Sequence, residues 1–314
     1  ELNRGSQETL PTEPDRFTKE DLMEREASYG KAGFALQFML DTTLADADKY
    51  PLKLSDLMVT ALNPKKGWAD LAWASGPTQI VENVPIVGFT GDKFYRPMWM
   101  SDDMLDFTGS VLAIDPSGRG KDETAYAVVK MLNGYLYVTR IGGFVGGYSD
   151  KTLTSLSTVA KQESVNMVIV ESNFGDGMYV KLLTPILNRI HKVSIEEVRH
   201  STQKEMRMID TLEPVMMQHR LIVDEKLIKE DYDSAPEPSY SLFYQMTRLT
   251  RDRGAIIHDD RLDALSMAVA YWTEQMDADS ESLASMQKTE AFNREIERFM
   301  DHAVGQKPRG ITWM

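Results

Sequence analysis

The feature that most constrains this chain is a run of three strand-forming segments in its middle. Val111–Ile114 is a short apolar segment that ends at Asp115 and is followed by a turn rich in Pro, Ser and Gly. Thr124–Met131 and Tyr135–Ile141 contain many β-branched and aromatic residues. Asn133-Gly134 between them is the dipeptide that most favours a two-residue hairpin turn. This part of the chain therefore predicts three consecutive antiparallel strands, the first of which ends on a carboxylate.

Helical and strand patterns alternate after the hairpin. Ser149–Ser164 begins with a serine that can cap a helix and places leucine and valine at helical spacing. Val165–Val170 is a continuous apolar run, the pattern of a strand buried on both faces, and it ends at Glu171. The order predicts an α/β fold. The further elements expected are a helix at Met178–Ile190, a strand at Val193–Val198, a helix at Lys204–Gln218 that Pro214 interrupts, and a helix at Leu262–Met276.

The chain divides into three parts that differ in their sequence patterns. Residues 1–109 are turn-rich and irregular, with one predicted helix at Lys19–Phe38, and residues 110–276 carry the α/β pattern. Residues 277–314 predict an acidic amphipathic helix, from Ser282 to about Met300, and a tail. Because the chain starts at Glu1 and not at a methionine, we expect it to be part of a longer protein.

Composition excludes several classes of site. The chain has no cysteine, so disulfides, cysteine zinc sites and thiol catalysis are excluded, and any metal must be held by carboxylates or histidine. No segment approaches the roughly 20 apolar residues of a membrane span, and no signal peptide opens the chain, so we expect a cytoplasmic protein. The net charge of −13 counts against a uniformly basic nucleic-acid binder.

Acidic residues at three distant positions carry the chemistry. Asp115 and Glu171 each follow a predicted core strand, and His258-Asp-Asp-Arg-Leu-Asp263 opens a predicted helix. Carboxylates at the ends of neighbouring strands meet at one sheet edge, where an acidic helix can complete a site for Mg²⁺ or Mn²⁺. Two such ions, about 3.5–4 Å apart, support phosphodiester hydrolysis. Taken singly, each acid is equally well explained by a turn, an exposed strand end or a helix cap.

Four segments resemble the nuclease half of the terminase large subunit (DNA maturase B) of short-tailed double-stranded-DNA phages. The similarity extends from about Asp15 to about Tyr271. The four segments are Asp115-Pro-Ser-Gly-Arg-Gly-Lys-Asp-Glu-Thr, Glu171-Ser-Asn-Phe-Gly-Asp-Gly, Lys204-Glu-Met-Arg-Met-Ile-Asp-Thr-Leu-Glu-Pro and His258-Asp-Asp-Arg-Leu-Asp-Ala-Leu.

The resemblance implies a ribonuclease H-like fold, in which three antiparallel strands are followed by parallel strands and flanked by helices. It implies an endonuclease that cuts concatemeric double-stranded DNA during packaging by means of two divalent ions, Mg²⁺ or Mn²⁺. Asp115, Glu171 and Asp263 are the implied metal-binding and catalytic acids. Asp260 and Asp259 are candidates for an additional ligand, and His258 is a weaker one.

The resemblance also implies partners for this chain in the host cytoplasm. They are the portal of the procapsid, the small terminase subunit and an ATPase domain of the same polypeptide, which residues 1–109 would follow as a linker. No Gly-x-x-x-x-Gly-Lys-Ser/Thr loop occurs, and in Gly118-Arg-Gly-Lys121 the next residue is Asp122 where Ser or Thr is needed. We therefore expect no ATP hydrolysis by this chain alone.

Basic residues near the proposed site are candidates for contacts with DNA phosphates. Each can equally be a solvated side chain paired with a nearby acid. The candidates are Arg119, Lys121, Lys204, Arg207, Arg248, Arg251 and Arg253.

Two other functions fit the same sequence. A junction resolvase or a transposase-like nuclease would use the same fold and the same acids. A non-catalytic module would instead dock to the portal through its acidic terminal segments. Preference for branched DNA distinguishes the first alternative, and portal binding without any cleavage distinguishes the second.

Overall fold

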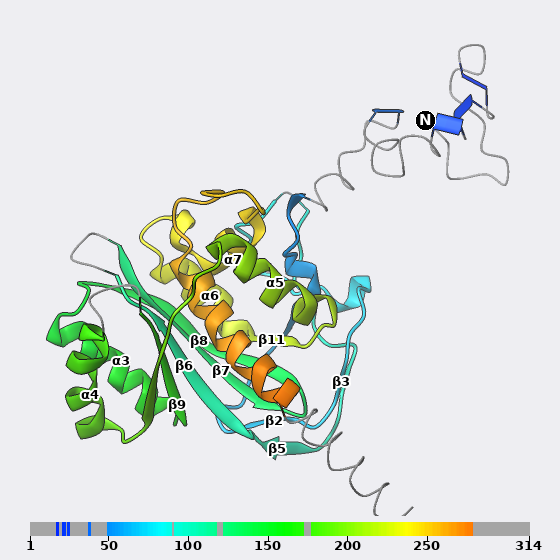
Figure 1. The fold of residues 1–314 in the computed structure, drawn as a ribbon. Helices are drawn as coiled ribbons and strands as arrows, with labels where there is room; N and C mark the ends of the chain where they lie inside the picture. Colours follow the sequence, from blue (N-terminus) through cyan, green and yellow to red (C-terminus); the bar gives the residue numbers. More distant parts are fainter. Residues whose placement is uncertain are drawn as a thin grey trace, which may run out of the picture. The chain divides into compact units, whose positions relative to one another are not determined.

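The computed structural model describes residues 17–18, 21–22, 24–25, 37–38 and 49–278, except for residues 90, 118–121 and 173–176 (Figure 1). The chain forms two compact units, Glu1–Val269 and Ala270–Met314. The fold described below is that of the first unit. The helix of residues 260–278 includes the boundary. Most of the helix predicted at Lys19–Phe38, and all of the one predicted at Ser282–Met300, lie outside the described residues.

A seven-stranded mixed sheet forms the centre of the fold. In the middle of the sheet, β7 is antiparallel to both of its neighbours, β8 and β6. The outer strands add to β8 and β6 in parallel. The predicted fold class is thereby confirmed. The strands, in their order across the sheet, are β1 (Met58–Thr60), β11 (Leu221–Asp224), β8 (Tyr135–Val145), β7 (Glu123–Leu132), β6 (Gly109–Asp115), β9 (Met167–Glu171) and β10 (Ser194–Val198).

The hairpin between β7 and β8 forms where its turn dipeptide predicts it. Asn133 and Gly134 have φ angles of 50° and 81°. Both lie in the left-handed region, as the turn that matches the twist of antiparallel strands requires. The turn lies at the end of the sheet opposite to Asp115, because Asp115 pairs with Ala125 near the start of β7.

Helices cover both faces of this sheet (Figure 1). α3 (Asp150–Gln162) and α4 (Met178–Ile190) bury leucine and valine residues against Leu112, Ile114 and Val170 on one face. On the other face lie α5 (Lys204–Met217), α6 (Glu225–Ser234) and α7 (Leu242–Arg248). The cap of α3 is as predicted, since Ser149 accepts a hydrogen bond from the backbone of Thr152.

The remaining elements are short. All but one of them lie between residues 54 and 106, and the last one directly precedes α7. Two small antiparallel sheets pair β2 with β5 and β3 with β4. These elements are η1 (Leu54–Asp56), β2 (Lys66–Trp68), β3 (Leu71–Ala72), η2 (Pro77–Gln79), β4 (Trp99–Met100), β5 (Met104–Asp106) and η3 (Pro238–Tyr240).

The fold differs from the sequence prediction at Pro214 and in several elements that were not predicted, among them α6 and α7. α5 continues through Pro214, so the predicted interruption is wrong: the proline removes only its own N–H donor, and its carbonyl still accepts a hydrogen bond from the backbone of Gln218. β1 comes from the segment predicted to be irregular, and β11 was not predicted. Both strands have four residues or fewer, too short to show a period. No helix in the described part of the chain has the length and apolar character to span a membrane.

Candidate metal centre

Two carboxylates meet at one edge of the sheet because the strands that carry them are parallel neighbours. Ile114 of β6 is in register with Val170 of β9, so the next residues, Asp115 and Glu171, lie side by side. Their side chains are buried, with residue exposures of 5% and 4%. Both acids are thus placed by strand ends, as the sequence predicts.

The third acid comes from the helix of residues 260–278. Asp263 lies in its first turn, where its backbone N–H donates to the carbonyl of Asp259, and it is completely buried. Asp115, Glu171 and Asp263 each offer a carboxylate oxygen, and these oxygens all lie within 4.8 Å of one another. Folding therefore brings together the three acids that the sequence predicts as one site.

Two cations from α5 enter this acidic centre. The Nζ atom of Lys204 lies 2.8 Å from Asp259, 3.0 Å from Asp263 and 3.3 Å from Asp115. Nη2 of Arg207 donates to Oδ2 of Asp263 at 3.0 Å and lies 3.4 Å from Oε1 of Glu171. Their spacing of three residues puts both side chains on one face of α5. In this structure they pair with the acids, and their predicted contact with DNA stays a prediction.

Burial and mutual repulsion disturb the titration of these acids. Burial raises the pKa of Asp115 well above its ordinary value, with Lys204 opposing the shift and the other acids adding to it. Burial and Asp263 likewise raise the pKa of Glu171. Burial alone would lower the pKa of Lys204, but the surrounding carboxylates raise it. The centre thus holds more negative charge than its two cations stabilise.

The donor set fits a hard divalent cation. Asp115, Glu171, Asp259 and Asp263 carry four formal negative charges against two positive charges from α5. Carboxylate oxygens are the ligands that Mg²⁺ and Mn²⁺ prefer, and no thiol or imidazole lies in the set. The three buried acids can therefore hold a metal ion at this edge of the sheet.

The remaining acidic candidates lie at the border of the centre. Asp259 pairs with Lys204, and burial raises the pKa of Asp260 to about 6. His258 stacks on the ring of Tyr240, with ring centroids 3.7 Å apart, and lies 3.8 Å from Asp122. Its ring is thus engaged outside the three-acid cluster, in agreement with its lower rank as a ligand.

The other predicted DNA contacts lie in different surroundings. Arg248 lies over the rings of Phe89 and Tyr244, 4.3 and 4.7 Å from their centroids. Arg251 pairs with Glu213 at 2.9 Å and with Asp210 at 3.4 Å. Arg253 is exposed. Arg119 and Lys121 lie outside the described residues.

His200 is a neighbour of the centre that sequence reasoning missed. It follows β10 by two residues, and β10 is the parallel neighbour of β9. Its Nε2 atom is buried and has no hydrogen-bond partner among the described residues. Burial and the charge of Arg207 lower its pKa. The sequence offered one signal for it: His200 follows a predicted strand, and the ends of neighbouring parallel strands lie at the same edge of a sheet.

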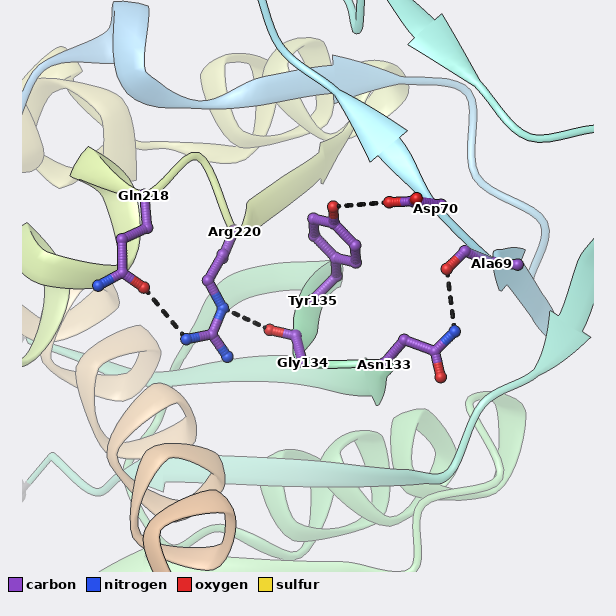
Figure 2. A pocket seen from close by; sticks show the side chains of 7 residues that line it. All are labelled: Ala69, Asp70, Asn133, Gly134, Tyr135, Gln218 and Arg220. Carbon is purple, nitrogen blue, oxygen red and sulfur yellow. Dashed lines mark hydrogen bonds between the residues drawn. The ribbon is translucent and has the colours of Figure 1, made fainter. Parts of the chain in front are cut away.

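A cavity of about 540 Å³ lies at the opposite edge of the sheet, around the β7–β8 turn (Figure 2). Its polar side chains are engaged with one another or with backbone. Tyr135 donates to Asp70, Arg220 donates to the carbonyl of Gly134, and Asn133 donates to the carbonyl of Ala69 (Figure 2). These contacts stabilise the turn and the segment beside it.

Comparison with known proteins finds similarity to phage terminases. Residues 114–221 match the family model described as terminase bacteriophage T7, ribonuclease H-like domain. The terminase large subunit of Enterobacteria phage T3 is 44% identical over 310 residues, which cover 97% of this chain and 52% of that protein. The chain thus spans about half the length of this relative.

The chain also has partial similarity to solved structures of viral nuclease domains. The nuclease domain of the large terminase subunit gp2 of bacterial virus Sf6 is 14% identical, with a TM-score of 0.41 over 52% of this chain and 88% of that one. The large terminase nuclease from thermophilic phage G20c is 10% identical, with a TM-score of 0.41 over 71% of this chain and 98% of that one.

Proposed function

We propose that this chain is the ribonuclease H-like part of a phage terminase large subunit and that it is a metal-dependent endonuclease acting on double-stranded DNA, as its similarity to these proteins supports. The convergence of Asp115, Glu171 and Asp263 carries the proposal. The nuclease chemistry belongs to residues 110–276, the segment that contains all three acids.

Asp115, Glu171 and Asp263 would hold two divalent ions, Mg²⁺ or Mn²⁺. Ions held there would activate a water molecule and stabilise the leaving oxygen of a phosphodiester. A neighbouring Asp259 or Asp260 would supply a further oxygen ligand. No covalent enzyme intermediate is needed.

Lys204 and Arg207 have two tasks in this proposal. Without metal they offset the repulsion among the acids, through the ion pairs of 2.8 to 3.4 Å described above. When a divalent ion binds, their positive charges become available to the phosphate that is cut. The exposed Arg251 and Arg253 bind the DNA backbone farther along the duplex.

The biological setting follows from the relationship to terminase large subunits. We propose that the chain cuts concatemeric viral DNA during packaging, in the host cytoplasm. An ATPase domain of the same polypeptide, the small terminase subunit and the portal of the procapsid are its proposed partners.

A plasmid-nicking assay tests the proposal. We expect the 314-residue chain to nick supercoiled plasmid with Mn²⁺ and without ATP. Asp115→Ala and Asp263→Ala should lower the rate at least about a hundredfold, because each removes a ligand. Asp233→Ala is the control, since Asp233 is an exposed acid of α6. Nicking by Asp115→Ala at the parental rate contradicts the proposal.

A further inference from the structure

Ile257 is the most exposed large apolar residue in the described part of the chain, with 91% of its surface accessible. It lies in the loop between α7 and the helix of residues 260–278. A single exposed apolar side chain is common on protein surfaces and needs no function. The anchoring of this loop and its position beside the acidic centre distinguish Ile257 from such residues.

Both ends of the loop are held in place. The backbone N–H of Gly254 donates to Glu205 at 2.7 Å, and the side chain of Gln203 donates to the carbonyl of Arg251 at 3.2 Å. On the other side of Ile257, the ring of His258 stacks on Tyr240. Gln203 and Glu205 flank Lys204, so the loop is fixed to the same turn of α5 that enters the acidic centre.

The chain keeps Ile257 close to the three acids. Asp259 is only two residues away, which limits the distance between the two Cα atoms to about 7 Å. Lys204 joins Asp259 to Asp115 through contacts of 2.8 and 3.3 Å. Ile257 therefore lies close to an acid that Lys204 ties to the acidic centre, near the place where the proposed function puts the DNA backbone.

A second exposed aliphatic residue lies at the same edge of the sheet. Val145, at the end of β8, is 63% exposed and is in register with Glu123. Glu123 in turn binds Arg261, in the first turn of the acidic helix. The chain thus exposes apolar side chains on two separate elements at this end of the sheet.

We propose that Ile257 is an apolar wedge that inserts between base pairs of the duplex held at the acidic centre. The inference rests on the proposed nuclease function. Aliphatic side chains that enter a base step unstack it and kink the duplex, and the side chain leaves water as it does so. The exposed Arg253 and Arg251 lie on the same loop to contact the flanking phosphates.

Fluorescence of 2-aminopurine, which rises when a base unstacks, tests the wedge directly. Short duplexes carrying the probe are mixed with the 314-residue chain in Ca²⁺, which binds carboxylate oxygens with looser geometry than Mg²⁺. We expect fluorescence to rise with the parental protein and not with Ile257→Ser, and the affinity of Ile257→Ser for duplex to fall about tenfold. Ile257→Leu keeps both properties.

Met217→Ser is the matched control. Met217 is 64% exposed, but it lies at the far end of α5, roughly 20 Å from Lys204 along the helix axis. This variant should bind and unstack DNA as the parental protein does. Absence of a fluorescence rise with the parental protein, or an equal rise with Ile257→Ser, overturns the wedge.

Mn²⁺ titration separates this proposal from the proposed function. Ile257→Ser should bind Mn²⁺ with parental affinity, because Ile257 provides no ligand. If Ile257→Ser unstacks DNA normally while nicking still depends on Asp115, the wedge is wrong and the nuclease stands. If Asp115→Ala nicks normally, the nuclease assignment fails whatever Ile257 does.

Discussion

Two clusters of buried charge share the first turn of one helix and are built in opposite ways. Arg261 is completely buried and binds Glu123 through two nitrogens, at 3.0 and 3.1 Å, and Asp231 at 2.8 Å. Two residues later, Asp263 joins Asp115 and Glu171 in an acidic centre, where the carboxylate oxygens lie within 4.8 Å of one another. We call the first the Arg261 cluster and the second the acidic centre.

The Arg261 cluster satisfies its charges within the chain. Asp231 also accepts hydrogen bonds from the hydroxyl of Ser241 at 2.8 Å and from the backbone of Leu242 at 3.1 Å. A buried ion pair is retained without large cost only when such additional hydrogen bonds are present. In the acidic centre three carboxylates instead crowd together and repel one another, so the centre gains stability from a cation that binds there. The Arg261 cluster holds the helix in place, whereas the acidic centre can bind a cation.

The largest expected effect comes from breaking the Arg261 cluster. Arg261→Met leaves Glu123 and Asp231 buried without their partner, and we expect it to lower the free energy of unfolding by about 3–5 kcal/mol. Urea denaturation measures the loss. Lys204→Met should cost less, because the Lys204 side chain is 31% exposed. Equal losses for the two variants would contradict the division into a structural and a ligand-ready cluster.

Metal binding should stabilise the acidic centre next most strongly. At a Mn²⁺ concentration 100 times the dissociation constant, we expect the free energy of unfolding to rise by about 2.7 kcal/mol. Thermal melts with and without Mn²⁺ measure this increase. Asp115→Ala should lose most of it, whereas Asp233→Ala should keep it. A metal effect that persists in Asp115→Ala would place the ion elsewhere.

Glu163 offers a test in a third, fully paired site. It binds Lys130 at 3.0 Å and Arg140 at 3.1 Å, and against the effect of burial these cations lower its pKa. Glu163→Gln should lower the free energy of unfolding at pH 7 by about 1–2 kcal/mol.

The pH dependence of this loss has a defined sign. Because the pKa of Glu163 is lower in the folded protein, its stabilisation is present above the ordinary carboxyl value of 4.5. It disappears as the pH falls from there through the lowered pKa. The free energies of unfolding of the parental protein and of Glu163→Gln, measured by urea denaturation, should therefore become equal at acidic pH. A difference that is constant with pH would exclude the ion pairs as its source.

The smallest effect should have the opposite sign. Asp115→Asn removes a buried charge whose pKa is raised in the folded protein, so without metal we expect it to stabilise the chain by about 1 kcal/mol at pH 7. Differential scanning calorimetry in EDTA measures the change. Destabilisation in EDTA would mean that the pairing of Asp115 with Lys204 outweighs the repulsion among the acids.

Local patterns account for the parts of the fold that the sequence predicts. The hairpin needs only Asn133-Gly134 between two strand-forming runs, and each strand that carries Asp115 or Glu171 is a continuous apolar run with a polar end. The short β1 and β11 escaped prediction because they are stabilised by pairing with each other and with β8, not by their own periodicity. Pro214 misled because the loss of one N–H donor does not by itself end a helix that the other backbone hydrogen bonds hold together.

The sequence by itself determined that Asp115 and Glu171 stand at strand ends, because a strand's period and its termination are local properties. Only the tertiary structure decided which charges meet. Lys204 and Arg207 enter the acidic centre, whereas Arg261, adjacent in sequence to Asp260, binds Glu123 and Asp231. Side chains on one helix turn point in different directions, so their partners depend on which elements pack around the helix.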